Sequence, residues 1–173
     1  MTSKERADAM TNGSKTVQVY RIVIKASAQS IWDAITNPEW TERFAYGGRA
    51  EYDLRGGGRF SHKASAEMKA HGLPDEIIVG EVLECDPPRK LVQTWHPLFD
   101  ANTIAEPPTQ LSYDITDHQN GQCTLTITHD VTSAPCVERM VQGGGNPAQG
   151  GGGWPWTLSD LKSLLETGKR MSA

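Results

Sequence analysis

The feature that most constrains the fold is the apolar face of a helix predicted near the end of the chain, directly after a run of glycines. Apolar residues recur there at i, i+4, i+7 and i+11, and they are Trp154, Leu158, Leu161 and Leu165. Pro155 suits a first helical turn, and Gly168 is a typical C-terminal stop. An amphipathic helix of this length is not stable alone in water. The rest of the chain is therefore predicted to supply a surface that covers this face.

A series of strand patterns precedes this helix. Segments rich in β-branched and aromatic residues, in which apolar and polar residues alternate, are typical of half-buried strands. These segments are residues 17–24, 49–54, 59–64, 76–85, 90–96, 110–116 and 122–130. Hairpin-length connections join several of them, which indicates antiparallel pairing.

The spacing of the apolar residues becomes helical after the first strand. Ser27 is a typical N-cap, and residues 30–35 place apolar side chains at helical spacing. The pair Asn37-Pro38 ends this helix, because a residue before proline avoids the α region. Residues 38–44 are predicted to form a second short helix with proline at its start.

Three longer segments connect the predicted elements. Residues 68–75 contain Gly72 and Pro74 and are interpreted as a connection, and residues 97–108 as a long loop. Residues 131–149 are weakly patterned, with one short helix around residues 137–141.

The pattern predicts an α+β protein in which a curved antiparallel sheet of about seven strands surrounds one long C-terminal helix, with two short helices after the first strand. At 173 residues the chain is expected to form one domain, over residues 16–173. Residues 1–15 have no apolar run and are expected to form a disordered tail. They resemble neither a signal peptide nor a membrane span.

Composition narrows the classes of partner. The chain has 17 Lys and Arg against 21 Asp and Glu, a net charge of −4, whereas a nucleic-acid-binding surface is typically basic. The three cysteines, Cys85, Cys123 and Cys136, form neither a C-x-x-C pair nor a metal-ligand spacing. Reduced thiols in a cytoplasmic protein are the simplest interpretation. We therefore expect no nucleic acid, no metal and no membrane span.

Four stretches, in this order, resemble the SRPBCC superfamily, the START and birch-pollen-allergen-like helix-grip proteins. They are Gly57 to Phe60, Gly80 to Trp95, Thr124 to His129, and Gly153 to Pro155 before the last helix. More narrowly, they resemble the branch of activator of heat-shock-protein-90 ATPase homologue-like proteins, over residues 17–168. The resemblance implies a helix-grip fold with a hydrophobic cavity between the sheet and the C-terminal helix.

Inward-facing side chains of the predicted elements would line such a cavity. The candidate ligand-binding residues are Tyr20, Trp32, Phe60, His62, Trp95, Tyr113, Ile127, His129, Trp154, Leu158 and Leu161. Tryptophans on a cavity wall would stack a flat ligand and offer indole N–H donors. Core packing alone would also explain them.

No catalytic residue or cofactor is assigned, because the sequence lacks nucleophile, zinc-protease and P-loop motifs. His62 and His129 are both predicted to face inward, where a pair of histidines could move protons or bind a metal. Two histidines without a placed carboxylate are not a zinc site, so bonding to neighbours is the preferred interpretation.

Three functions are therefore considered. The first is a binding protein for a small apolar or aromatic molecule, without catalysis of its own, in a stress response. The second is a polyketide cyclase- or hydrolase-like enzyme that uses His62 or His129 as acid or base. The third, implied by the family name alone, is a co-regulator of a chaperone ATPase.

Residues 131–153 and 97–108 are expected to border the cavity entrance and to become ordered when ligand binds.

Overall fold

The computed structural model describes residues 14–171, so the predicted tail lies almost wholly outside the described residues. Within these residues, seven strands form one antiparallel sheet, and a 15-residue helix, α7 (Gly153–Thr167), packs against it. The strands are β1 (Val17–Ile24), β2 (Arg49–Tyr52), β3 (Arg59–Lys63), β4 (Glu76–Asp86), β5 (Lys90–Pro97), β6 (Thr109–Asp117) and β7 (Cys123–Asp130). The predicted α+β helix-grip fold is confirmed.

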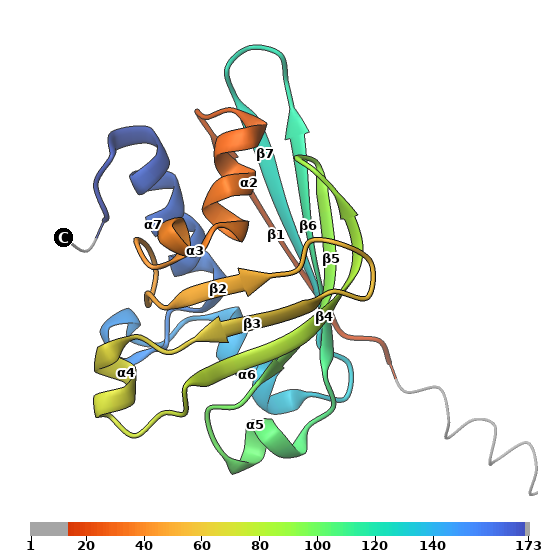
Figure 1. Ribbon diagram of the computed structural model, residues 1–173, viewed down its shortest axis with the longest axis vertical. Helices are drawn as coiled ribbons and strands as arrows, with labels where there is room; N and C mark the ends of the chain where they lie inside the picture. The colour runs from red at the N-terminus through yellow and green to blue at the C-terminus, as the bar shows by residue number, and fades with distance from the viewer. Residues whose placement is uncertain (1–13, 172–173) are drawn as a thin grey trace, which may run out of the picture.

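The strand order is β1-β7-β6-β5-β4-β3-β2, so β1 and β2 are the two edges. All neighbours pair antiparallel, and only β1 with β7 pairs strands that are far apart in the sequence. The sheet curves strongly, and its β2 edge lies on the same side as α2 and α7 (Figure 1). Irregular pairing at His62/Lys63 and between Val82 and Glu84 accompanies this curvature, because bulges bend a strand.

Short helices fill the connections between strands. They are α2 (Ala28–Thr36), α3 (Pro38–Thr41), α4 (Ala66–Ala70), α5 (Ala101–Ala105) and α6 (Pro135–Gln142), with one 3₁₀ turn, η1 (Pro147–Gln149). The Ser27 hydroxyl accepts a hydrogen bond from the Ser30 N–H at the start of α2, and the Asn37 side chain caps α3. The two helices predicted after the first strand are therefore confirmed, although the second ends at Thr41.

The connections predicted over residues 68–75 and 97–108 are not wholly irregular. The helix α4 extends into the first of them, and α5 lies within the second. Ser65 accepts from the Met68 N–H at the start of α4. Asp100 and Thr103 form a reciprocal capping box around α5. The helix predicted around residues 137–141 is confirmed as α6.

Two faces of α7 are buried, not one. Leu158 and Leu161 are each at most 4% exposed, as the periodicity predicts for the apolar face. Leu164, outside the predicted face, is equally buried, whereas Leu165 is only partly buried. Asp160, which the pattern places on the wet side, is 0% exposed, because backbone N–H groups from other segments approach it. The stop at Gly168 is confirmed: this glycine has φ +75°, and its N–H bonds to the Leu164 carbonyl.

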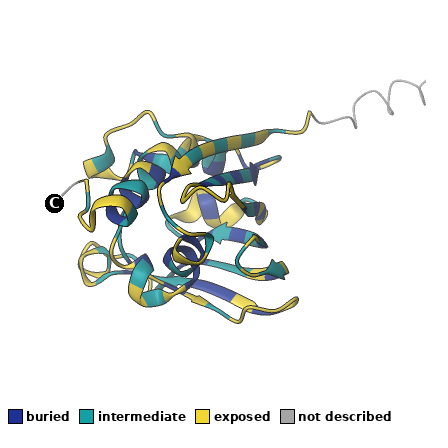
Figure 2. Cartoon of the chain, turned by 90° about the horizontal axis from the view of Figure 1, so that it is seen from above, coloured by how far each residue is buried: buried dark blue, intermediate teal, exposed yellow. Residues whose placement is uncertain are grey.

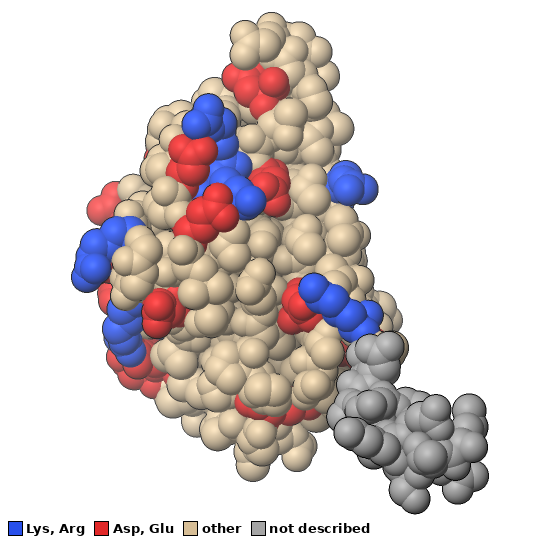
Figure 3. All heavy atoms as spheres, turned by 90° about the vertical axis from the view of Figure 1, so that its right-hand side faces the viewer, with Lys and Arg blue, Asp and Glu red and all other residues tan. Residues whose placement is uncertain are grey.

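The hydrophobic core lies between the concave face of the sheet and the helices (Figure 2). Its largest fully buried side chains include Ile24, Ile31, Leu91, Leu111 and Leu125, which come from four strands and α2. On one outer face, acidic and basic side chains are intermixed among uncharged residues (Figure 3). Within residues 14–171, no helix is both long and apolar enough to cross a membrane.

Candidate ligand cavity

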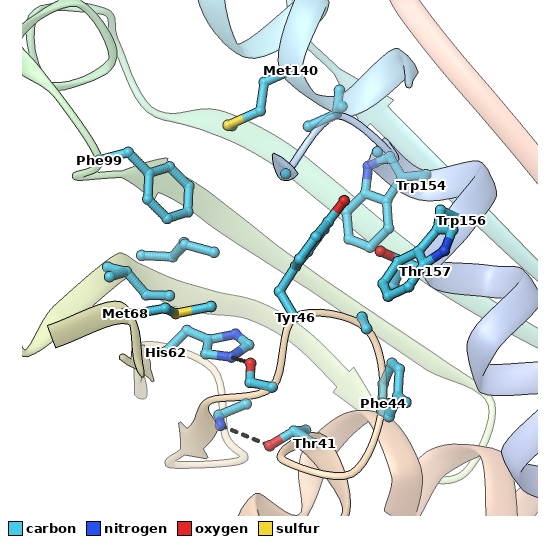
Figure 4. Close-up of a pocket in the computed structure, with 18 of the residues that line it drawn as sticks. Thr41, Phe44, Tyr46, His62, Met68, Phe99, Met140, Trp154, Trp156 and Thr157 are labelled. Atoms are coloured by element: carbon cyan, nitrogen blue, oxygen red, sulfur yellow. Dashed lines mark hydrogen bonds between the residues drawn. The ribbon is translucent and has the colours of Figure 1, made fainter. Parts of the chain in front are cut away.

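A cavity of about 1010 Å³ lies between the concave face of the sheet and α7. Residues of the six strands β2 to β7 form its floor, and α4, α5, α6 and the segment 44–48 surround it (Figure 4). The labelled lining residues of Figure 4 are Thr41, Phe44, Tyr46, His62, Met68, Phe99, Met140, Trp154, Trp156 and Thr157. Most of these side chains are aromatic or aliphatic, so the cavity suits an apolar ligand.

Aromatic rings form one continuous wall. Trp154 of α7 lies edge-on to Tyr113, with ring centroids 6.2 Å apart and planes at 90°. Its ring centroid is 6.4 Å from that of Trp95 on β5. A second pair of rings, Tyr52 on β2 and Phe60 on β3, stacks with ring centroids 4.6 Å apart. These rings come from four strands and one helix, so the folded sheet, not a local motif, builds the wall.

His129 lies behind this wall and holds Trp154 in place. The Trp154 indole N–H donates to His129 Nδ1 at 3.1 Å, so Nδ1 is an acceptor. His129 Nε2 therefore carries the proton and donates to the Thr109 hydroxyl at 2.8 Å, which donates in turn to the Trp95 carbonyl. Burial lowers the pKa of His129 to about 4, so the ring is neutral at pH 7. Both nitrogens are used, and His129 does not line the cavity.

His62 lies on the cavity surface. Its Nε2 is 3.1 Å from the carbonyl oxygen of Gly47, in the segment that follows α3. Burial lowers the pKa of His62, and the hydrogen bond to Gly47 opposes this change. The neutral ring is therefore favoured at physiological pH.

Tyr52, which lines the cavity, is paired with the buried side chain of Gln93. The Tyr52 hydroxyl donates to Gln93 Oε1 at 2.8 Å, and Gln93 Nε2 has no hydrogen-bond partner among the described residues. Burial raises the pKa of Tyr52 well above its ordinary value, and repulsion from an ionised Tyr113 raises it further. Burial also raises the pKa of Tyr113. Both phenols are therefore neutral at physiological pH.

A segment that follows α3, residues 44–48, crosses the cavity beside α7. The Tyr46 ring stacks on Trp156 at 4.9 Å, and the Tyr46 hydroxyl accepts from the Gly152 N–H at 2.9 Å. One oxygen of Asp160 accepts from the Ala45 N–H at 2.7 Å. This segment is thus fixed to both the start and the middle of α7.

The glycine-rich segment before α7 is closely packed. A Cβ on Gly143 would lie 2.4 Å from the Gly152 carbonyl oxygen, and one on Gly153 would lie 2.4 Å from the Gly143 nitrogen. Both glycines also have positive φ, of +77° and +58°. These glycines therefore allow two backbone segments to approach closely.

Eight of the eleven predicted ligand-binding residues line the cavity. These are Phe60, His62, Trp95, Tyr113, Ile127, Trp154, Leu158 and Leu161. Tyr20, Trp32 and His129 do not line it. The Tyr20 hydroxyl bonds to the Gln18 side chain and the Val141 carbonyl, and Trp32 is 4% exposed within the core. The segments 97–108 and 131–153 both contribute lining residues. That they border the entrance and become ordered with ligand stays a prediction.

The sequence analysis did not identify Phe44, Tyr46, Met68, Phe99 or Met140 as lining residues. They lie in segments interpreted as short helices or connections, whose approach to the cavity depends on the closed sheet. One local signal was present, because the spacing Asp100-x-x-Thr103 is that of a capping box. Among the described residues, no group of three or more His, Cys, Asp or Glu side chains could hold a metal ion.

Comparison with protein families gives a match to the model described as "Activator of Hsp90 ATPase homolog 1-like protein", over residues 25–166. The chain belongs to this family. The match runs from the end of β1 to the last turn of α7, and so includes all the lining residues of the cavity except Arg170. A search of curated protein sequences gives no significant match.

Solved structures of members of this fold are similar to the chain. The Aha1 dimer from Colwellia psychrerythraea has a TM-score of 0.60 and 17% identity, covering 89% of this chain and 98% of that one. An HSP90 activator from Plasmodium falciparum has a TM-score of 0.52 and 20% identity, covering 90% and 91%. CalU16 from Micromonospora echinospora has a TM-score of 0.53 and 21% identity, and the match covers 70% of this chain but only 64% of CalU16. These likenesses show the fold.

Proposed function

We propose that this member of the Hsp90-ATPase-activator-like family binds a small apolar or aromatic molecule in the cavity between the sheet and α7. The observation that carries the proposal is the cavity of about 1010 Å³, with its wall of Trp95, Tyr113 and Trp154. Cavities near this size bury most of the surface of a drug-sized ligand. The hydrogen bond from Trp154 to His129 holds the wall in one arrangement, which lowers the entropy cost of binding.

The positions of the two histidines reduce the enzyme alternative to one candidate residue. A cyclase- or hydrolase-like mechanism that used His62 or His129 as acid or base would need that side chain at the cavity surface. His129 instead uses both ring nitrogens in bonds to Trp154 and Thr109. Only His62 of the pair lines the cavity.

A second candidate, co-regulation of a chaperone ATPase, is supported by the family description and by the Plasmodium falciparum relative, which is named as an HSP90 activator. Its test is the steady-state ATPase rate of purified Hsp90 with and without the protein. A rate that stays unchanged at saturating protein would reject this candidate. The cytoplasmic location and the role in a stress response remain predictions, which cell fractionation and growth of a deletion strain at raised temperature test.

Ligand binding is tested with 1-anilinonaphthalene, an apolar aromatic dye whose emission rises in an apolar site. Native mass spectrometry of the freshly purified protein should also show a bound small molecule. Two variants on α6 form a matched pair: Met140→Trp adds an indole at the cavity wall, and Gln142→Trp adds one at an exposed position. We expect Met140→Trp to weaken dye binding by about tenfold, whereas Gln142→Trp binds as the unmodified protein does. Equal binding by both variants, or no binding by the unmodified protein, would contradict the proposal.

A further inference from the structure

One ring nitrogen of His62 has no partner within residues 14–171. Its Nε2 lies 3.1 Å from the Gly47 carbonyl oxygen, and a carbonyl only accepts, so Nε2 carries the proton. No hydrogen bond is formed by Nδ1 with any of the described residues. Figure 4 shows the His62 ring between Met68 and Tyr46, on the surface of the cavity.

The surrounding backbone fixes this orientation of the ring. A Cβ at Gly48 would lie 2.8 Å from His62 Nε2 and 2.5 Å from the Lys63 carbonyl oxygen. Gly48 also has φ +87°, a conformation that other residues rarely adopt. A glycine at this position therefore lets the imidazole approach Gly47, and the bond to Gly47 directs Nδ1 toward the cavity.

Among the described residues, none of the polar side chains that line the cavity forms a hydrogen bond with this nitrogen. Met68 and Phe99 border the same part of the cavity (Figure 4). The Thr41 hydroxyl, which also lines it, is within hydrogen-bond distance of the Pro38 and Gly48 carbonyls and accepts from the Ala50 N–H. Because burial lowers the pKa of His62, Nδ1 keeps its lone pair at neutral pH and acts as an acceptor. An acceptor at an apolar surface favours a ligand group that donates a hydrogen bond.

We propose that the ligand of this cavity carries a phenolic or enolic hydroxyl, which donates a hydrogen bond to Nδ1 of His62. This inference rests on the proposed function, and it adds the chemical class of the ligand. The aromatic wall selects a flat ring system, and His62 selects its hydroxylated members. Replacing the hydroxyl with a methyl ether removes the donor and leaves the ring system unchanged.

The test compares 2-naphthol with 2-methoxynaphthalene by calorimetry. For each protein, the measured quantity is the affinity for 2-naphthol divided by that for 2-methoxynaphthalene. One net hydrogen bond corresponds to roughly 3- to 10-fold in affinity. This ratio should therefore be larger by about that factor in the unmodified protein than in a His62→Phe variant. His62→Gln, whose amide can donate to Gly47 and also accept, should retain part of the preference. His118→Phe is the matched control, because it removes an exposed histidine outside the cavity; it should keep the full preference.

A second readout needs no variant. Nitrogen-15 spectra of the imidazoles should show His62 with a protonated Nε2 and an unprotonated Nδ1 in the free protein. Naphthol should shift the Nδ1 signal, and the methyl ether should not.

The outcomes separate the two proposals. If both compounds bind in the cavity with the same affinity ratio in the unmodified protein and in His62→Phe, the hydroxyl assignment is wrong and the cavity is still a binding site. An unchanged Nδ1 signal with bound naphthol contradicts the assignment in the same way. If neither compound binds at all, the proposed function fails, and the hydroxyl assignment fails with it.

Discussion

His129 connects β7, the start of β6 and α7 through hydrogen bonds from both of its ring nitrogens. The sequence predicted that it faces inward, because alternation along β7 places it on the same face as Leu125 and Ile127. Its side chain is 0% exposed, in agreement with this prediction. What alternation could not predict is that Trp154, in the first turn of a helix distant in the sequence, would lie between His129 and the cavity. That placement depends on how α7 packs across the finished sheet.

The same network predicts a pH dependence. The pKa of His129 is about 4 when folded and near 6.5 when unfolded, so the unfolded state binds the proton more tightly. The stability that the neutral ring contributes is therefore complete above pH 6.5, and it is lost as the pH falls toward 4. This loss amounts to roughly 3 kcal/mol. Protonation of Nδ1 would also break the bond from Trp154.

Urea unfolding at several pH values between 7 and 4 measures this effect. A His129→Asn variant, which cannot titrate, should lose less free energy of unfolding over that interval than the unmodified protein, by about 2–3 kcal/mol. Parallel curves for the two proteins would show that His129 is not the group responsible.

Asp160 joins three separate segments at the level of secondary-structure elements. One carboxylate oxygen accepts from the Ala45 N–H at 2.7 Å and from Arg170 Nε at 3.3 Å, and the other accepts from the Met171 N–H at 2.7 Å. An Arg170 N–H also donates to the Ala45 carbonyl. The end of the chain and the segment 44–48 are therefore held against the middle of α7. A helical wheel places Asp160 with the polar residues, and it could not show that two backbone N–H donors reach it.

Asp160→Asn tests this connection. The substitution replaces one acceptor oxygen with an amide N–H₂, which faces at least one N–H donor in a buried site. We expect a loss of about 2–4 kcal/mol in the free energy of unfolding, together with faster hydrogen exchange at Ala45 and Met171. Asp114→Asn is the control, because Asp114 is partly exposed and forms no side-chain hydrogen bond with described residues. Equal losses in both variants would contradict this role of Asp160.

Glu106 caps α6, a helix that lines the cavity. The residue before α6, Ala134, offers no side-chain cap, and Glu106 instead accepts from the Cys136 N–H at 2.6 Å and the Val137 N–H at 3.0 Å. Burial alone would raise the pKa of Glu106, but these bonds lower it below its ordinary value. The carboxylate therefore stabilises the start of α6.

Glu106→Gln should lower the free energy of unfolding by about 1–2 kcal/mol, because the amide nitrogen cannot accept one of the two N–H bonds. Hydrogen exchange should become faster at Cys136 and Val137 and stay unchanged at α7. Glu138→Gln, in the first turn of α6, is the matched control and should have little effect. Unchanged exchange at Cys136 and Val137 would show that the helix start does not depend on this cap.

Long elements with a clear period could be predicted from the sequence, whereas two of the short helices, α4 and α5, could not. The apolar repeat of α7 and the alternation of the strands each depend on residues close in the chain. α4 and α5 have five residues each, too few for a period, and they begin at Ser65 and Asp100 caps that the sequence analysis did not use. Local caps decide such helices.

At the scale of the whole molecule, the fold and part of the cavity followed from the sequence. The strongly curved sheet and α7 brought together residues predicted to face inward, such as Phe60, Trp95 and Tyr113. The part of the cavity wall formed by the segment 44–48 could not be predicted. Tyr46 in this segment contacts α7 through a hydrogen bond to Gly152, 106 residues away. No local pattern specifies a contact over that separation.

The central claim is that an aromatic ligand binds in the cavity and not on the surface. The chain has five tryptophans, so its indole N–H groups give five separate NMR signals. Trp95, Trp154 and Trp156 line the cavity, whereas Trp32 is buried in the core and Trp40 lies under Arg43, outside the cavity. The decisive measurement is a ¹H–¹⁵N titration with 2-naphthol. We predict that the indole signals of Trp95, Trp154 and Trp156 shift together and saturate, while those of Trp32 and Trp40 stay in place. Shifts confined to Trp40, or no saturable shift at any indole, would contradict the assignment of this cavity as a ligand-binding site.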